Sequence, residues 1–126
     1  MRVALAVLVA LAGIAGPARA QTNINQFNDA PAAKFSPQDF EMFWASVNEV
    51  SAETSTGAVK TWENAATGSG GTIKLLKIFT SADGRDCRRL RVDNHHKSLK
   101  GSSKQTVCAS PEGKWLIDAD AKPAPG

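Results

Sequence analysis

The sequence predicts an α+β domain in which one N-terminal helix packs on an antiparallel meander sheet of four to five strands, with one disulfide. Three observations lead to this prediction. One early segment repeats its apolar residues at helical spacing, the rest of the chain alternates with a period of two between short turns, and there are two cysteines. One helix followed by a run of strands is typical of a helix laid on one face of a sheet.

The helix is predicted over residues 37–53. Ser36 can cap it, Pro37 suits the first helical position, and Asp39 places an acid in the first turn. Large apolar side chains then recur at helical spacing, at Phe40, Phe43, Trp44, Val47 and Val50. We expect this stripe to face the core rather than a ligand, and Gly57 to lie in the exit turn.

Five strands are predicted after the helix, because the apolar residues then alternate between turn signals. Their expected ranges are residues 59–62, 72–80, 85–94, 103–109 and 114–118. The expected connections are turns at residues 67–71, 82–84 and 111–113 and a loop over residues 95–102. Short connections favour antiparallel neighbours, so the sheet should be a meander.

The first twenty residues have the pattern of a secretory signal peptide. A positive charge at Arg2 precedes the apolar run Val3–Ile14, and Ala18-Arg19-Ala20 offers a cleavage site before Gln21. The apolar run is too short to span a bilayer, which needs about 20 residues. We therefore expect an exported chain without a transmembrane segment after cleavage.

The rest of the chain divides into three parts. Residues 21–35 have no periodicity and are expected to form a flexible arm. Residues 36–120 form the predicted domain, and residues 121–126, rich in proline, form a disordered tail.

Cys87 and Cys108 are the two cysteines of the chain. An even number in an exported protein indicates a disulfide, which would stabilise the fold by about 3 kcal/mol. The alternative, a redox-active pair, lacks the C-x-x-C spacing. If the two cysteines face each other, Leu90 and Val107 share the core face and the bridge lies on the other face. A bulge near Gly101 would shift this register.

Charge is unevenly distributed along the chain. The formal net charge is +3, and loss of Arg2 and Arg19 with the leader lowers it to +1. Residues 21–66 carry a net charge of −4, whereas residues 67–126 carry +5. The mature protein is therefore not strongly basic overall. Nucleic acid is not an expected partner for an exported protein.

Three sequence segments resemble the C-terminal domain of the rickettsial-type outer-membrane surface antigens of alphaproteobacteria. They are the W-x-N-x-x-T-G-x-x-G pattern over residues 62–71, Cys87-Arg88, and Cys108 followed by Glu112-Gly113-Lys114-Trp115. The resemblance covers about residues 57–118. The motif residues, which we expect to serve folding, are Trp62, Asn64, Gly68, Gly71, Gly113 and Trp115.

This resemblance implies an envelope protein without known catalytic residues. Two departures limit what it implies about the membrane. Many members carry a lipid-accepting cysteine at the cleavage site, where this chain has Gln21. Many also carry a glycine-rich segment before the domain, whereas residues 21–35 contain no glycine. We therefore expect no lipid anchor. The resemblance, with these departures, implies an exported protein that is periplasmic, associated with the outer membrane, or secreted.

Catalytic and metal-binding patterns are weak in this sequence. His95-His96 is the one histidine pair, and two adjacent imidazoles fall short of the three or four ligands of a zinc site. The mature chain has no G-x-S-x-G nucleophile motif and no phosphate-binding P-loop. The sequence predicts no catalytic residue, no metal site, no cofactor and no enzymatic activity.

A basic hairpin offers the one candidate contact surface. Arg89, Arg91 and Lys104 are expected to line the face of the sheet that carries the disulfide. They would bind an anionic envelope component or another envelope protein. The expected function is that of an exported, non-enzymatic envelope protein with a surface-antigen-like structural or interaction role, and the alternative is a periplasmic binding or inhibitor module that uses this hairpin. Alternatively, these bases bind no ligand and form a solvated face of the sheet, on which lysines at the edge prevent aggregation. The oligomeric state is not predicted.

Overall fold

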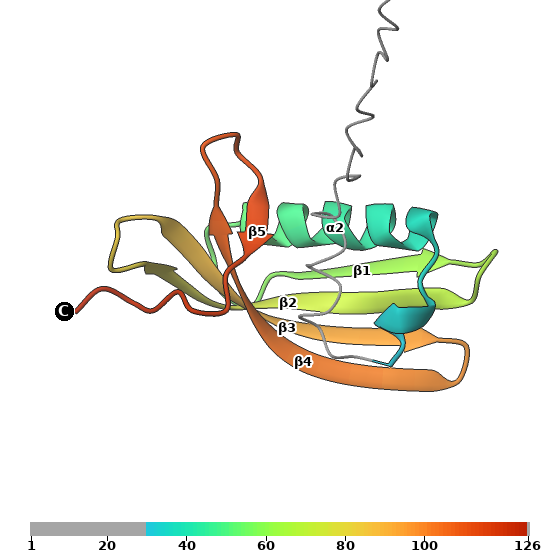
Figure 1. The fold of residues 1–126 in the computed structure, drawn as a ribbon. Helices are drawn as coiled ribbons and strands as arrows, with labels where there is room; N and C mark the ends of the chain where they lie inside the picture. Colours follow the sequence, from blue (N-terminus) through green and yellow to red (C-terminus); the bar gives the residue numbers. More distant parts are fainter. Residues whose placement is uncertain (1–29, 126) are drawn as a thin grey trace, which may run out of the picture.

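The computed structural model describes residues 30–125, so the predicted signal peptide and most of the predicted arm lie outside the described residues. One α-helix, α2 (Pro37–Ser51), is followed by five strands in a single antiparallel sheet of order β1-β2-β3-β4-β5. Figure 1 shows α2 lying along one face of this sheet. The predicted α+β meander with one disulfide is therefore confirmed.

Helix α2 begins as the sequence predicts. The Ser36 hydroxyl accepts a hydrogen bond from the Asp39 N–H at 3.1 Å, and the Asp39 carboxylate accepts one from the Ser36 N–H at 2.9 Å. Pro37 occupies the first turn. The helix ends at Ser51, two residues before the predicted end, and the chain then turns through Gly57, whose φ is 91°.

The core lies between α2 and one face of the sheet. Phe43, Val47 and Val50 are the fully buried residues of the helix stripe, and Phe40 and Trp44 pack beside them. The sheet supplies the opposite side of the core through Trp62, Ile73, Leu75, Leu90, Val92 and Val107. The aromatic stripe is thus part of the core, as expected.

The first four strands are longer than predicted, whereas the fifth, predicted over residues 114–118, is shorter. The five strands are β1 (Val59–Asn64), β2 (Ser69–Thr80), β3 (Asp86–His96), β4 (Leu99–Ala109) and β5 (Trp115–Ile117). The predicted loop over residues 95–102 is wrong, because β3 and β4 continue through it and leave a turn at residues 97–98. Lys97 takes a φ of 54°, a left-handed conformation that glycine usually adopts. No glycine marks this turn in the sequence.

Both ends of the described chain are more ordered than expected. Within the predicted arm, residues 32–34 form the 3-10 turn η1 (Ala32–Lys34), and Phe35 packs edge-to-face on Trp62 with ring centroids 5.2 Å apart. Within the predicted tail, Pro123 pairs with Ser81, and the Ala124 N–H donates to the Thr80 carbonyl at 2.9 Å. Apolar burial holds the first segment, and free backbone groups at the end of β2 hold the second.

The disulfide joins Cys87 and Cys108, which face each other on β3 and β4. The β3–β4 register is continuous past Gly101 and pairs Leu90 with Gln105, as predicted. The register shift lies elsewhere, in β2 between Leu75 and Lys77. The bridge lies on the sheet face opposite α2, where Phe79 and Leu116 are its cross-strand neighbours.

Candidate anion-binding face

The face of the sheet opposite α2, hereafter the outer face, is rich in basic side chains. Alternation along β1 to β4 places on it six bases and two acids. The bases are Lys74, Lys77, Arg89, Arg91, Lys100 and Lys104, and the acids are Glu63 and Asp93. All three bases predicted for this face are among them.

Three of these bases form a row across three adjacent strands. Lys74 of β2 is the cross-strand partner of Arg91 of β3, and Arg91 is in turn the partner of Lys104 of β4. We call Lys74, Arg91 and Lys104 the cationic row. Arg89 lies outside it, and its Nη1 donates to the Thr106 hydroxyl at 2.9 Å. The sequence did not reveal Lys74 as part of this row. Lys74 lies in a largely apolar strand, and only the pairing of β2 with β3 shows that it faces Arg91.

The cationic row is only partly neutralised. Arg91 pairs with Asp93, with 3.1 Å between Nε and Oδ2. Among residues 30–125, no carboxylate lies within ion-pair distance of Lys74 or Lys104. Like charges directly opposite each other on neighbouring strands are destabilising. Repulsion within the row is therefore expected to oppose folding, and Lys74 and Lys104 present positive charge on the outer face.

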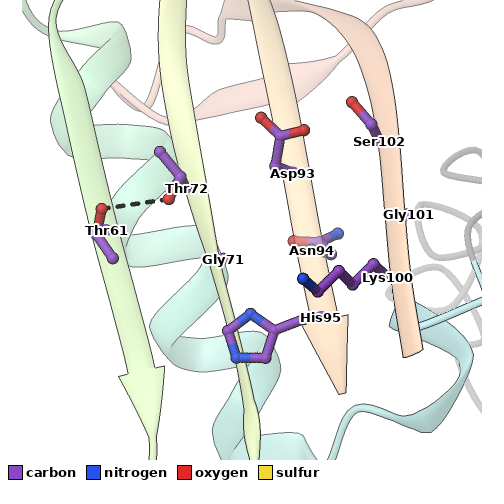
Figure 2. A pocket seen from close by; sticks show the side chains of 9 residues that line it. All are labelled: Thr61, Gly71, Thr72, Asp93, Asn94, His95, Lys100, Gly101 and Ser102. Atoms are coloured by element: carbon purple, nitrogen blue, oxygen red, sulfur yellow. Dashed lines mark hydrogen bonds between the residues drawn. The ribbon is translucent and has the colours of Figure 1, made fainter. Parts of the chain in front are cut away.

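Beside the cationic row the outer face is hollowed. The depression measures about 450 Å³ and crosses β1 to β4 (Figure 2). Its lining is polar: Thr61, Thr72, Asp93, Asn94, His95, Lys100 and Ser102, with Gly71 and Gly101. The Thr61 and Thr72 hydroxyls are 3.2 Å apart. We call this depression the hollow.

Asp93 is the acidic group of the hollow. Partial burial raises the pKa of its carboxyl, but hydrogen bonds from Ser102 and Arg91 and the charge of Arg91 outweigh this effect. The net result is a pKa below the ordinary value, so the carboxylate stays ionised at neutral pH. The hollow thus holds a fixed negative charge next to the cationic row.

The end of the hollow away from the row is bounded by a contact between His95 and Glu63. The His95 Nε2 and Glu63 Oε2 atoms lie 3.1 Å apart across β2, over Gly70. A Cβ at Gly70 would lie 2.2 Å from Glu63 Oε2 and 2.7 Å from His95 Cε1. Only glycine leaves room for this contact.

The two adjacent histidines do not form a common site. Strand alternation directs His95 to the outer face and His96 to the opposite face. There the Nδ1 atom of His96 lies 2.7 Å from the hydroxyl of Ser69, which is fully buried and cannot meet a substrate. Residues 30–125 contain no group of three His, Cys, Asp or Glu side chains arranged to hold a metal.

The first motif connects the β1–β2 turn to the start of α2. The buried Asp39 carboxylate accepts hydrogen bonds from the Asn64 amide and the Thr67 hydroxyl, both at 2.7 Å. Gly68 adopts a φ of 74° at the turn. These motif residues therefore serve folding, although Asp39 itself lies outside the motif.

Trp62 and Gly71 pack against each other within the same motif. Trp62 is buried in the core, and its indole N–H has no hydrogen-bond partner among the described residues. A Cβ at Gly71 would lie 2.5 Å from the Asp93 carbonyl oxygen and 3.0 Å from the Trp62 Nε1. Glycine is thus required where β3 and the indole approach β2.

The second and third motifs meet at the other end of α2. Arg88 is buried, donates from Nε to the Ser51 carbonyl at 2.9 Å, and pairs with Asp86. Its guanidinium lies 4.7 Å from the centre of the Trp115 ring. A cation at a helix C-terminus is favourable. Gly113, with a φ of 82°, allows the turn that brings Trp115 into place.

These observations define a small disulfide-bonded α+β domain. Its three sequence motifs build the fold, and its outer face carries basic side chains. The chain belongs to the family of the 17 kDa outer membrane surface antigen, whose family model matches residues 49–116. The matched residues span all of β1 to β4, including the disulfide and the cationic row. The suspected resemblance is therefore confirmed.

Two further comparisons gave no match, neither among curated proteins nor among solved structures. Family membership indicates an envelope or surface location. Within residues 30–125, no helix has the length and apolar character needed to cross a membrane.

Proposed function

We propose that this protein is exported to the cell envelope and acts there without catalysis, as an interaction domain. Its outer face would bind an anionic component of the envelope through the cationic row. Cleavage of residues 1–20 before Gln21 is part of this proposal, as is a folded unit that extends from Pro31 to Ala124. Family membership supports the envelope location. The burial of the motif residues Trp62, Asn64, Gly71 and Trp115 in the fold supports a non-catalytic role.

The observation that carries the proposal is the position of the row within the sheet. Edge lysines that discourage aggregation belong on edge strands. Lys104 fits that explanation, because β4 pairs with β5 only from Val107 onward. Lys74 and Arg91 do not, because β2 and β3 are interior strands. Protection of a sheet edge therefore does not explain why Lys74 and Arg91 face each other on interior strands, beside Lys104. Binding of an anion explains the row better.

Binding to anionic vesicles tests this proposal. We expect the protein to bind phosphatidylcholine vesicles that contain lipid A, and not vesicles of phosphatidylcholine alone. Binding should weaken steeply with salt, because the Debye length falls from about 10 Å at 0.1 M to about 3 Å at 1 M. The triple variant Lys74→Gln, Arg91→Gln, Lys104→Gln should bind at least about tenfold more weakly.

A matched control removes three bases elsewhere. Lys60, Lys114 and Lys122 lie off the outer face of β1–β4 and are exposed. Their replacement by glutamine changes the net charge equally and should leave binding within about twofold of the wild type. Equal losses in the two triple variants, or wild-type binding that is insensitive to salt, would count against a specific anion-binding row.

A further inference from the structure

We propose that the ligand of the outer face is a phosphorylated saccharide, with its phosphate on the cationic row and a sugar ring in the hollow. This inference rests on the proposed anion contact and adds the chemistry of the hollow. The cationic row and the hollow form one continuous surface on β1 to β4, and one ligand would occupy both.

The spacing of the rows supports this placement. Thr72, Asp93 and Ser102 form the next cross-strand row on the outer face, two residues along from the cationic row. Two residues along a strand span about 6.7 Å, roughly the length of one sugar ring. A phosphate held by the cationic row therefore puts the attached ring over this second row.

The groups in the second row match sugar hydroxyls. The Ser102 hydroxyl donates to Asp93 and keeps its acceptor capacity, and the Thr61 and Thr72 hydroxyls, 3.2 Å apart, keep one donor and further acceptor capacity between them. The ionised Asp93 carboxylate already accepts from Arg91 and Ser102, and any further partner that it takes from a ligand must be a donor. A sugar carries several hydroxyl groups on adjacent carbons and meets this requirement.

Asp93 also argues against a continuous polyanion. A chain of phosphates that followed the outer face from the cationic row would place its next phosphate beside the Asp93 carboxylate, at a repulsive cost. A saccharide places neutral hydroxyl groups there. Asp93 is paired with Arg91 and shares the hollow with Lys100, so the hollow lacks the excess of positive charge found on the cationic row. This difference favours a ligand that is charged at one end and hydrogen-bonding at the other.

The hollow does not suit insertion into a bilayer. Its lining contains no large apolar side chain. Among residues 30–125, the exposed large apolar residues are Val59, Leu99 and Leu116, which lie on three different strands. They form no common patch for acyl chains, so the headgroup sugar rather than the membrane interior is the expected contact.

Isothermal titration with three soluble probes tests the inference. The probes are a glucosamine disaccharide that carries one phosphate at its reducing end, the same disaccharide without phosphate, and linear tripolyphosphate. We expect the wild type to bind the phosphorylated disaccharide at least about tenfold more tightly than either other probe. The Lys74, Arg91, Lys104 triple variant should lose binding of both phosphate-bearing probes.

Two variants in the hollow separate saccharide recognition from general anion binding. Asp93→Asn should lower the preference for the phosphorylated disaccharide over tripolyphosphate by about tenfold, since it removes both an acceptor and a repulsion. Thr72→Val, which keeps size and charge, should weaken the disaccharide alone by about fivefold. Thermal unfolding of each variant checks that the fold is intact.

The outcomes distinguish the inference from the proposed function. If tripolyphosphate binds as tightly as the phosphorylated disaccharide and only the cationic row matters, the saccharide inference is wrong and the anion contact stands. If the wild type binds none of the probes, or the triple variant binds them equally well, both are wrong.

Discussion

Replacement of Asp39 by alanine should lower the free energy of unfolding by about 3–5 kcal/mol. The carboxylate is fully buried and accepts hydrogen bonds from the Ser36 N–H, the Asn64 amide and the Thr67 hydroxyl. Alanine would leave these donors unsatisfied at the junction of α2 with the β1–β2 turn. Each buried donor left without a partner costs about 1–3 kcal/mol. Chemical denaturation at neutral pH measures the difference.

The same substitution should change how stability depends on pH. Burial raises the pKa of the Asp39 carboxyl, but the hydrogen bonds from Ser36, Thr67, Asn64 and Ser69 together lower it below the ordinary value. A depressed pKa means that the stabilisation is complete above the ordinary carboxyl pKa and is lost as the pH falls through the lower folded-state pKa. The difference between wild type and Asp39→Ala should therefore shrink in acid.

Glu41→Ala is the matched control, because Glu41 is an exposed carboxylate on the same helix. We expect it to change the free energy of unfolding by less than about 0.5 kcal/mol. If Asp39→Ala is no more destabilising than Glu41→Ala, or if the difference from the wild type grows in acid, the connecting role of Asp39 is wrong.

Loss of the Cys87–Cys108 bond should cost about 2–4 kcal/mol of stability. The two residues are 21 positions apart, so the bond closes a loop that contains most of the β3–β4 hairpin. Both cysteines are buried, with exposed fractions of 0% and 2%. Denaturation of the wild type with and without a reductant measures the effect, and native protein should show no reactive thiol.

The double variant Cys87→Ala, Cys108→Ala provides the control for this measurement. It should have about the stability of the reduced wild type and should not respond to the reductant. Two reactive thiols in the native protein, or equal stability before and after reduction, would contradict the structural role of the bond.

Local signals predicted the parts of the fold that local chemistry determines. The Ser36-Pro37-Gln38-Asp39 start of α2 was evident because capping needs only neighbouring residues. The β3–β4 register was evident because a bond between Cys87 and Cys108 places these two residues opposite each other and so fixes the pairing of the two strands. The turn at residues 97–98 was not evident, since Lys97 adopts there a conformation for which its residue type gives no signal.

The candidate site was less accessible to sequence reasoning. Arg91 and Lys104 were found because they lie near the cysteines, whose pairing sets their face. Lys74 and the hollow depend on which strands are neighbours across the whole sheet, and that information is non-local. Asp39 looked like a first-turn acid, and only the packing of α2 on the β1–β2 turn gave it its buried partners.

We propose that the cationic row serves binding at a cost to folding. The melting temperature of the Lys74, Arg91, Lys104 triple glutamine variant, measured without ligand at low salt, tests it most directly. We expect a rise of about 1–4 °C over the wild type, because cross-strand repulsion is removed and the exposed Arg91–Asp93 pair contributes little. A fall in melting temperature would show that these three side chains stabilise the fold, and would contradict a cost of the cationic row to folding.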